Sequence, residues 1–321
     1  MENREKSYRK KTVLVTGANS GIGKAASLLF AKRGHRVIMV CRDKARGEKA
    51  RVEIMRATGS DQVALALSDV SSKTSIDRFC EDFFKTHDVL DVLIHNAAYV
   101  NHGAPLRLSD DGTEITFATN VAGPVYMTRK LAERLSRSVD ARVLHAGSNI
   151  IKHFFDDKLV INPQTIGGEG MDAKRYRVYD RYRDSKMALL MLTFELAKEL
   201  SGENIAVNML QINGATMSPE TLAKVTWPYR LVGRVQNLFF RSPEFMAGLY
   251  YEISVSERFR GVTGRLFNHR LEEMRPGREN PGLLEQIGQL AGASRYPRHA
   301  LDGEVTAAIL QRCSDWASMD R

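Results

Sequence analysis

A tyrosine and a lysine four residues apart, Tyr182 and Lys186, are the side chains of this sequence best suited to move a proton. They lie at the start of a strongly helical pattern over residues 180–200, and a spacing of four places both on one helix face. A free phenol has a pKa of about 10, so it needs help to exchange protons near neutrality. An ammonium roughly 4 Å away supplies about 4 kcal/mol at an effective dielectric of about 20, enough to lower that pKa by a few units.

The same spacing occurs at Tyr126 and Lys130, so spacing alone does not identify the reacting pair. Position along the chain separates the two pairs. Tyr182 follows a predicted strand and the loop at Ser148, whereas Tyr126 lies in the helical region before that strand. We therefore expect Tyr182 and Lys186 to be the pair that supports proton transfer. Tyr126 and Lys130, the decoy pair, share the spacing but are expected to have no part in the reaction.

Two polar residues could assist the pair. Ser148 could hydrogen-bond a substrate oxygen, although a lone serine after a strand is also typical of a helix cap or turn, so it counts only together with Tyr182. Asn120 lies where a long helical region, residues 109–135, is expected to break. It could bend the helix and hold a water leading to Lys186, although asparagine at such an interruption is also commonly structural.

A glycine-rich turn, Thr16–Gly23, directly follows the first predicted strand and opens the first predicted helix. Its three glycines, Gly17, Gly21 and Gly23, let the backbone turn tightly and come close to a diphosphate. The helix start offers unpaired N–H groups at the positive end of its dipole. In this strand-to-helix context the turn predicts a nucleotide-binding site.

The end of the second predicted strand bears on the kind of nucleotide. In NAD-dependent enzymes an acidic residue about here binds the ribose hydroxyls, whereas an arginine accommodates a 2′-phosphate. Arg42 comes first after the strand and could pair with a phosphate dianion. Asp43 could bind the ribose hydroxyls instead, and Arg42 could be only a surface cation. The order of the two residues favours NADP(H) over NAD(H).

Short β-rich runs alternate with longer helical patterns, as in parallel sheets built from right-handed crossovers. We expect strands at residues 12–16, 36–40, 62–67, 91–95, 142–146, 205–211 and 264–267. We expect helices at residues 21–33, 45–57, 72–86, 109–135 and 180–200, and one starting at 242–244. The pattern predicts an α/β fold with a doubly wound, mostly parallel sheet (a Rossmann fold) flanked by helices.

Residues 1–270 are expected to form one domain, and residues 271–321 a C-terminal extension packed on it, with about two short helices. Two irregular stretches, about 149–179 and 212–241, follow the fifth and sixth strands at the carboxyl edge of the sheet, where ligands bind in such folds. Phe154, Phe155 and the aromatic residues of 227–240 suggest a bulky, mostly apolar substrate. An amphipathic helix packed against a partner would show the same pattern.

Composition narrows the class of protein. Hydrophobic residues make up 43% and charged residues 26%, as in ordinary globular proteins. The net charge of +9 comes without a basic repeat or nucleic-acid module, so we expect no nucleic-acid partner. The three cysteines, Cys41, Cys80 and Cys313, have no paired spacing, which argues against disulfides and zinc and favours a reducing compartment.

The sequence shows no apolar signal core near its start and no apolar run of about 18 residues, so no transmembrane segment is expected. We expect a cytoplasmic protein. Loose peripheral contact with a membrane stays open because Arg230, Arg234 and Arg241 accompany aromatic residues.

In combination these motifs resemble the short-chain dehydrogenase/reductase family, and most closely its retinol-dehydrogenase-like branch. The resemblance runs from about Lys11 to Asn268. Besides the glycine turn, it rests on Val40–Asp43, Asp69–Val70, Asn96–Ala97, Asn120, Ser148, Tyr182–Lys186, Ser242–Glu244 and Gly261–Gly264.

The resemblance implies hydride transfer between NADP(H) and a small-molecule carbonyl or alcohol. Tyr182 would donate or accept the proton, and Lys186 would bind the nicotinamide ribose and lower the tyrosine pKa. Ser148 would orient the carbonyl, and Asn120 would support a proton relay. The residues implied to bind the cofactor are Gly17, Asn19, Ser20, Gly21, Ile22, Gly23, Arg42, Asp69, Val70, Asn96, Ala97, Tyr182 and Lys186.

Among these, Asp69 would bond the adenine amine, with Val70 beside it, and Asn96 would steady the backbone after the fourth strand. Relatives usually associate through the helices at about 120–135 and 180–200, so the resemblance also implies a homo-oligomer.

The sequence departs from the family pattern near the nicotinamide end. His95 and Ala98 replace the usual Asn and Gly around Asn96–Ala97, Gly147 replaces a serine, and Ile212–Asn213 occupies the usual Pro-Gly position. Two alternatives to a carbonyl reductase or alcohol dehydrogenase therefore stay open. One is a non-catalytic NADP(H)-binding protein, and the other is a family member that catalyses a non-redox step such as cyclisation.

Overall fold

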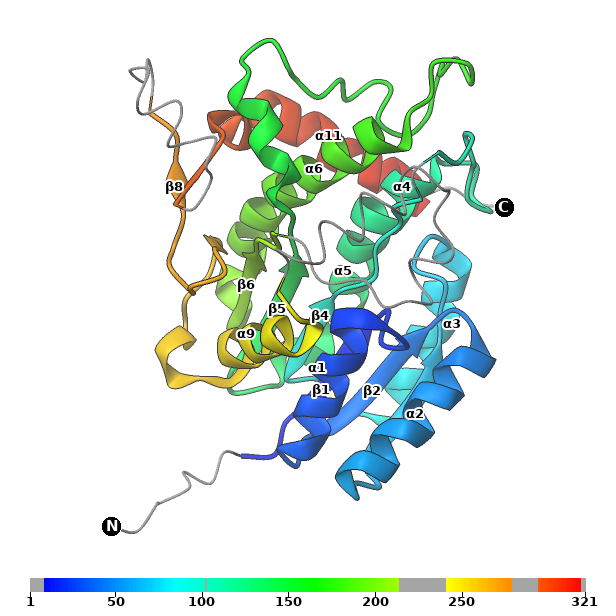
Figure 1. Ribbon diagram of the computed structural model, residues 1–321, viewed down its shortest axis with the longest axis vertical. Coiled ribbons are helices and arrows are strands. Elements are labelled where there is room, and N and C mark those ends of the chain that lie inside the picture. Colours follow the sequence, from blue (N-terminus) through cyan, green and yellow to red (C-terminus); the bar gives the residue numbers. More distant parts are fainter. Residues whose placement is uncertain (1–8, 102, 214–240, 279–293, 319–321) are drawn as a thin grey trace.

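The computed structural model describes residues 9–101, 103–213, 241–278 and 294–318 and is built on one seven-stranded sheet (Figure 1). The strand order is β3-β2-β1-β4-β5-β6-β7, and every neighbouring pair is parallel. The strands are β1 (Thr12–Thr16), β2 (Arg36–Cys41), β3 (Val63–Leu67), β4 (Val92–His95), β5 (Ala141–Ala146), β6 (Ile205–Leu210) and β7 (Arg265–Phe267). The predicted doubly wound Rossmann sheet is confirmed.

Helices cover both faces of the sheet, so the inner strands are buried on both sides and read as nearly continuous apolar runs, whereas β3 at the edge is partly exposed. In β1, for example, Leu14 packs into one helix layer while Val13 and Val15 pack into the other. One layer consists of α1 (Gly21–Lys32), α2 (Lys44–Thr58) and α9 (Pro243–Val255). The other consists of α3 (Lys73–Thr86), α5 (Gly123–Ser136) and α6 (Val178–Glu199).

The helical region expected at 109–135 begins later than predicted. It starts with the short α4 (Ile115–Phe117), continues as a π-helical turn over Ala118–Ala122, and then becomes α5. The Glu114 carboxylate accepts the backbone N–H groups of residues 116 and 117, so this buried residue caps the helix and the chain before it forms a turn. The predicted start at Ser109 was wrong, whereas the interruption expected at Asn120 is present as the π-helical turn.

The described part of the C-terminal segment contains one long helix and strands that were not predicted. It holds a small parallel pair, β8 (Arg275–Pro276) with β9 (Arg295–Tyr296), a 3-10 turn (Arg298–Leu301) and the 16-residue α11 (Gly303–Ser318). Ile309, Cys313 and Trp316 face inward from α11, which packs on α5 and α6. These are the two helices through which association was expected, and α11 covers part of them.

No helix within the described residues is both long and apolar enough to span a membrane.

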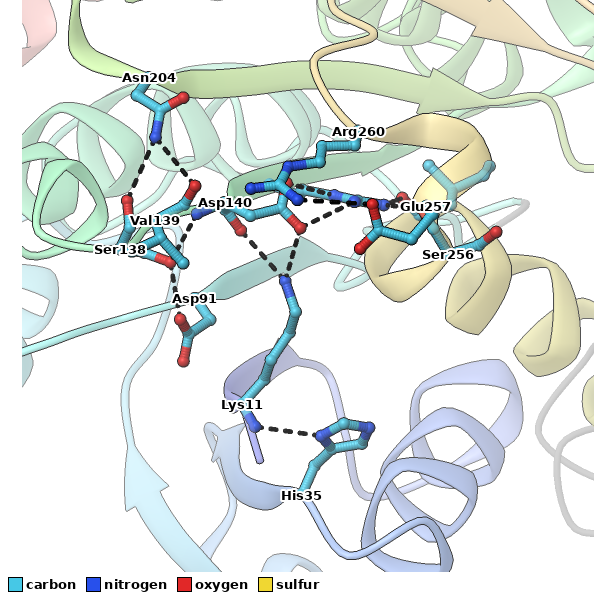
Figure 2. Close-up of polar contacts among 12 residues, drawn as sticks. Lys11, His35, Asp91, Ser138, Val139, Asp140, Asn204, Ser256, Glu257 and Arg260 are labelled. Carbon is cyan, nitrogen blue, oxygen red and sulfur yellow. Dashed lines mark hydrogen bonds and ion pairs between the residues drawn. The ribbon is translucent and has the colours of Figure 1, made fainter. Parts of the chain in front are cut away.

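A polar network closes the amino-terminal edge of the sheet, on the side opposite the strand ends that carry the site (Figure 2). The Arg142 side chain is 2% exposed and forms two hydrogen bonds with the Asp140 carboxylate, at 3.0 and 2.7 Å. The third nitrogen of its guanidinium group donates to the backbone carbonyls of Ile253, within α9, and Ser256, directly after α9. Lys11 donates to the same carboxylate at 2.9 Å.

This network predicts that Asp140→Asn destabilises the fold at neutral pH. Burial alone would raise the pKa of Asp140, but the hydrogen bonds from Arg142 and Lys11 outweigh it and hold the pKa below its usual value. Such a carboxylate stabilises the protein above its unfolded-state pKa of about 4, and this contribution is lost as the pH falls through the lower folded-state value. The loss in unfolding free energy at pH 7 should be about 3 kcal/mol, because the substitution leaves Arg142 buried without its anion.

Urea unfolding at pH 7 and at pH 3 measures this difference, which should shrink at the lower pH. Asp82→Asn is the matched control, because Asp82 pairs with Lys85 on the exposed surface of α3. Equal unfolding midpoints for the two variants at pH 7 would contradict the assignment.

Candidate active site

The candidate site forms where the carboxyl ends of β1, β4 and β5 meet the start of α6. The strands are in register, with Val15 opposite Ile94 and His95 opposite His145, so the segments after them lie at one level. Ser148 follows β5, and Tyr182 and Lys186 lie in the first turns of α6. The sheet therefore brings together residues that are far apart in the sequence.

Three of the predicted residues converge. The Ser148 hydroxyl lies close enough to the Tyr182 hydroxyl to lower its pKa. The Lys186 ammonium lies 5.6 Å from the centre of the Tyr182 ring and donates a 2.7 Å hydrogen bond to the backbone carbonyl of Ala146, at the end of β5. Ser148 also caps the 3-10 helix Asn149–Phe155 by accepting the N–H of Ile150 at 3.3 Å, so it has both the site contact and the capping role considered from the sequence.

The electrostatics of the pair differ from the expectation. Burial raises the pKa of Tyr182, and the neighbouring Ser148 hydroxyl offsets this only in part. Lys186 is not a cause of any lowering, because its ammonium is directed at the Ala146 carbonyl and faces the ring instead of the phenolic oxygen. The pKa of Lys186 itself is lowered from 10.5 to about 8 because the side chain is buried. In these contacts Tyr182 is a protonated phenol at neutral pH.

Asn120 is fully engaged within the π-helical turn. Its side-chain oxygen accepts the N–H of Tyr99 at 2.7 Å, and its side-chain nitrogen donates to the Tyr99 carbonyl and to the Ser185 hydroxyl at 3.0 Å. Ser185 in turn donates to the Tyr182 carbonyl. Asn120 thus joins the segment after β4 to the first turn of α6, and its side chain contacts neither Tyr182 nor Lys186 through a hydrogen bond.

The decoy pair has a structural role. The Tyr126 hydroxyl donates to Asp77 of α3 at 2.7 Å, and Lys130 forms an ion pair with the same carboxylate. The Tyr126 ring also packs edge-on against Trp316 of α11. The pair links α5 to α3 and α11 and lies away from Ser148.

The glycine turn comes very close to the segment after β4. A side-chain carbon on Gly17 would lie 2.9 Å from the Cα of Ala97, and one on Gly23 would lie 2.5 Å from the amide nitrogen of Asn96. Gly17 also has a φ of 66°, in the left-handed region that favours glycine. Ser20 precedes α1 but makes no capping bond with its side chain, so it leaves the first N–H groups of the helix to a ligand.

A cavity of about 320 Å³ opens beside this turn. Its lining includes most of the residues expected to bind the cofactor and stops at Tyr99 and Thr119, short of Ser148, Tyr182 and Lys186. The lining residues are Gly17, Asn19, Ser20, Val40, Arg42, Asp43, Arg46, Ser68, Asp69, Val70, Asn96, Ala97, Ala98, Tyr99 and Thr119. Ile22, Gly21 and Gly23 belong to the same turn but do not line the cavity.

Charges at the far end of the cavity bear on the choice of nucleotide. Asp43 caps α2 by accepting the N–H of Arg46, and its second oxygen pairs with the Arg46 guanidinium at 3.1 Å. Arg42 is 55% exposed and pairs only loosely, at 3.4 Å, with Asp69. The acidic residue is therefore engaged within the chain, while two guanidinium groups border the cavity. Sequence reasoning missed Arg46, because only the way α2 begins after Asp43 brings this residue to the cavity.

Asp69 and Asn96 line the cavity and are both held by hydrogen bonds within the chain. The Asp69 carboxylate accepts the N–H and hydroxyl of Ser71. The Asn96 amide donates to the carbonyls of Thr16 and Gly17 at 3.0 and 3.4 Å and so holds the glycine turn against β4.

The departures from the family pattern have local explanations. Gly147 lies so close to β6 that a side-chain carbon would be 2.9 Å from the Leu210 carbonyl. His95 and His145 lie side by side in the core, bonded to Thr128 and Thr193, and burial lowers the pKa of both imidazoles far enough to keep them neutral.

Asn213 is held by Gln211 and His269, and Asn149 donates to the carbonyl of Ile212. The segment after Asn213, including the aromatic stretch 227–240, lies outside the described residues.

The stretch between Ser148 and Tyr182 is held in place by its neighbours. Tyr176 donates to the buried Glu114 carboxylate at 2.7 Å, and Arg312 of α11 binds Glu169. Phe154 is buried in the core, stacked on His299, so its aromatic ring gives no indication of a substrate. Phe155 is only half-buried.

Residues 11–155 match the family model described as short chain dehydrogenase. Retinol dehydrogenase 13 of Homo sapiens is 31% identical over 274 residues, which cover 80% of this chain and 76% of that protein. Retinol dehydrogenase 12 of Mus musculus is 33% identical, with 80% and 77% covered.

Among solved structures, a short chain dehydrogenase from Shigella flexneri, complexed with NADP, superposes with a TM-score of 0.62 at 19% identity over 81% of this chain and 97% of that one. The fold, the converging Tyr182, Ser148 and Lys186, and this similarity agree. The chain belongs to the short-chain dehydrogenase/reductase family and is retinol-dehydrogenase-like.

Proposed function

We propose that the protein is an NADP(H)-dependent oxidoreductase in which Tyr182 is the general acid or base. The observation that carries this proposal is that Ser148 lies beside the Tyr182 hydroxyl while the buried Lys186 ammonium lies 5.6 Å from the centre of the Tyr182 ring. Such a grouping offers a proton and a second hydrogen bond to one substrate oxygen. The glycine approach, the open helix start and the cavity fit a dinucleotide, which when bound supplies or accepts the hydride.

In the reductive direction Tyr182 transfers its proton to the carbonyl oxygen. Burial favours the protonated phenol, so the donor is loaded at neutral pH. Ser148 orients the same oxygen by hydrogen bonding. Lys186, held at the Ala146 carbonyl beside Tyr182, would bind the nicotinamide ribose of the cofactor.

NADP(H) is proposed over NAD(H) because Arg42 and Arg46 border the cavity while Asp43 is occupied as a helix cap. The solved relative complexed with NADP is consistent with this choice. A bulky, mostly apolar carbonyl or alcohol is proposed as substrate, since the similar proteins are named for the apolar alcohol retinol. A cytoplasmic location stays a proposal, supported by three buried free thiols.

Tyr182→Phe should lower turnover by about 10³-fold, because the proton donor is lost, while NADP⁺ still binds. NADPH oxidation with a panel of apolar aldehydes and ketones measures turnover, and fluorescence titration measures binding. Tyr126→Phe is the matched control, because it removes a phenol with the same lysine spacing outside the site. Equal turnover of Tyr182→Phe and wild type would exclude the proposed chemistry, and cofactor binding without turnover in wild type would favour a non-catalytic binding protein.

Arg42→Ala combined with Arg46→Ala should weaken kcat/KM for NADPH by about 10- to 100-fold, the value of charge-assisted hydrogen bonds to a phosphate. The value for NADH should stay within about two-fold of wild type, since NADH has no 2′-phosphate. Arg51→Ala serves as control, because Arg51 is on the same helix but pairs with Glu48 away from the cavity. Parallel losses with both cofactors would refute the role of the two arginines.

Lys186→Met should stabilise the fold while abolishing activity. Lowering the pKa of Lys186 from 10.5 to about 8 corresponds to a cost of about 3 kcal/mol at neutral pH, and the lost hydrogen bond to Ala146 offsets about 1 kcal/mol. Wild type gains stability as the pH rises from about 8 to 10.5, because the unfolded chain then holds the extra proton. The advantage of Lys186→Met, about 2 kcal/mol at pH 7, should therefore shrink toward pH 10.

Urea unfolding across this pH range tests the prediction. Lys198→Met, at an exposed position of the same helix, is the control and should unfold as wild type does. An advantage of Lys186→Met that stays constant with pH would argue against a buried ammonium.

A further inference from the structure

Tyr250 is a buried phenol that the proposed chemistry does not use. It lies in the middle of α9, on the opposite side of the sheet from α6, and its side chain is 0% exposed. The helix packs closely on α1, whose first turn belongs to the nucleotide site. The Tyr250 hydroxyl donates to the side-chain oxygen of Asn96 at 3.3 Å.

Asn96 is the link between this phenol and the glycine turn. Its side-chain nitrogen donates to the carbonyls of Thr16 and Gly17, and its backbone N–H donates to the Thr16 hydroxyl. The amide has one acceptor end and one donor end. Because Tyr250 occupies the acceptor end, the donor end is turned toward the carbonyls of the turn.

The Asn96 side-chain amide has little room to move. The amide nitrogen of Asn96 approaches Gly23 so closely that a side-chain carbon there would be 2.5 Å away. An amide rotated by half a turn would bring its oxygen against the carbonyl oxygens of Thr16 and Gly17, and two acceptors repel. The orientation of a single amide therefore decides whether the glycine turn is held.

We propose that Tyr250 is a positioning residue that fixes the Asn96 amide and thereby holds the glycine turn in the shape that accepts the diphosphate of NADP(H). The inference rests on the proposed function, since it assumes that the turn binds this cofactor. Tyr250 acts through Asn96 and is not a catalytic residue.

The neighbouring Tyr251 offers a matched control. It is also buried in α9, and its hydroxyl contacts the ring nitrogen of His35 at 3.3 Å. His35 lies beyond the end of α1 remote from the turn, where its other ring nitrogen accepts the backbone N–H of Lys11. Tyr251→Phe thus removes one phenolic hydroxyl from the same helix without touching the site.

The experiment measures dissociation constants of the full-length protein for NADP⁺ and for 2′-AMP by titration. Tyr250→Phe should weaken NADP⁺ binding about five-fold, the value of one lost hydrogen bond. It should leave 2′-AMP binding within about two-fold of wild type, because 2′-AMP carries the adenosine and 2′-phosphate but no diphosphate. Tyr251→Phe should change neither constant, and urea unfolding verifies that both variants are folded.

A double-mutant cycle with Asn96→Ala tests the proposed route. Once the amide is absent, adding Tyr250→Phe should cause no further loss of NADP⁺ affinity. Equal losses in the presence and absence of the amide, a matching loss for 2′-AMP, or unchanged NADP⁺ binding by Tyr250→Phe would each overturn the inference while leaving the proposed function intact. Wild type that binds no NADP⁺ would instead overturn both.

Discussion

The close approach of the glycine turn to the end of β4 is the constraint on which the site depends. Gly17 and Ala97 pack so tightly that no side chain fits between them, and Asn96 bonds the two segments together. Because β4 is paired on its other side with β5, the same approach sets the distance from the nucleotide turn to Ser148. The cavity beside the glycine turn and the Tyr182 phenol therefore share one rigid frame of parallel strands.

Local signals were enough to predict most of the framework. The inner strands of the sheet are buried on both faces, so their apolar runs are nearly unbroken. Helices α2, α3 and α9 begin at side chains that cap them, Asp43, Ser72 and Ser242. The start at Ser109 failed because Glu114, the true cap, is supported by Gly167 and Tyr176, which are far away in sequence. No local pattern contains that information.

The site could be predicted as a set of residues but not as an electrostatic arrangement. A spacing of four correctly places Tyr182 and Lys186 on one helix, yet it cannot tell that the ammonium binds the Ala146 carbonyl. The direction of the Tyr182 pKa shift follows from that contact and from burial, and both arise only when β5 and α6 pack. Arg46 was overlooked for a related reason, since its link to the cavity depends on how α2 begins.

The C-terminal helix α11 adds a layer over α5 and α6 that the chain supplies for itself. The Trp316 ring packs edge-on against the Tyr126 ring. Arg312 forms an ion pair with Glu169, which lies in the stretch before α6. A covering element tethered to the same polypeptide stays at a fixed local concentration, whereas one contributed by another molecule is lost on dilution. The cover that α11 provides over α5 and α6 therefore does not depend on the binding of a second molecule.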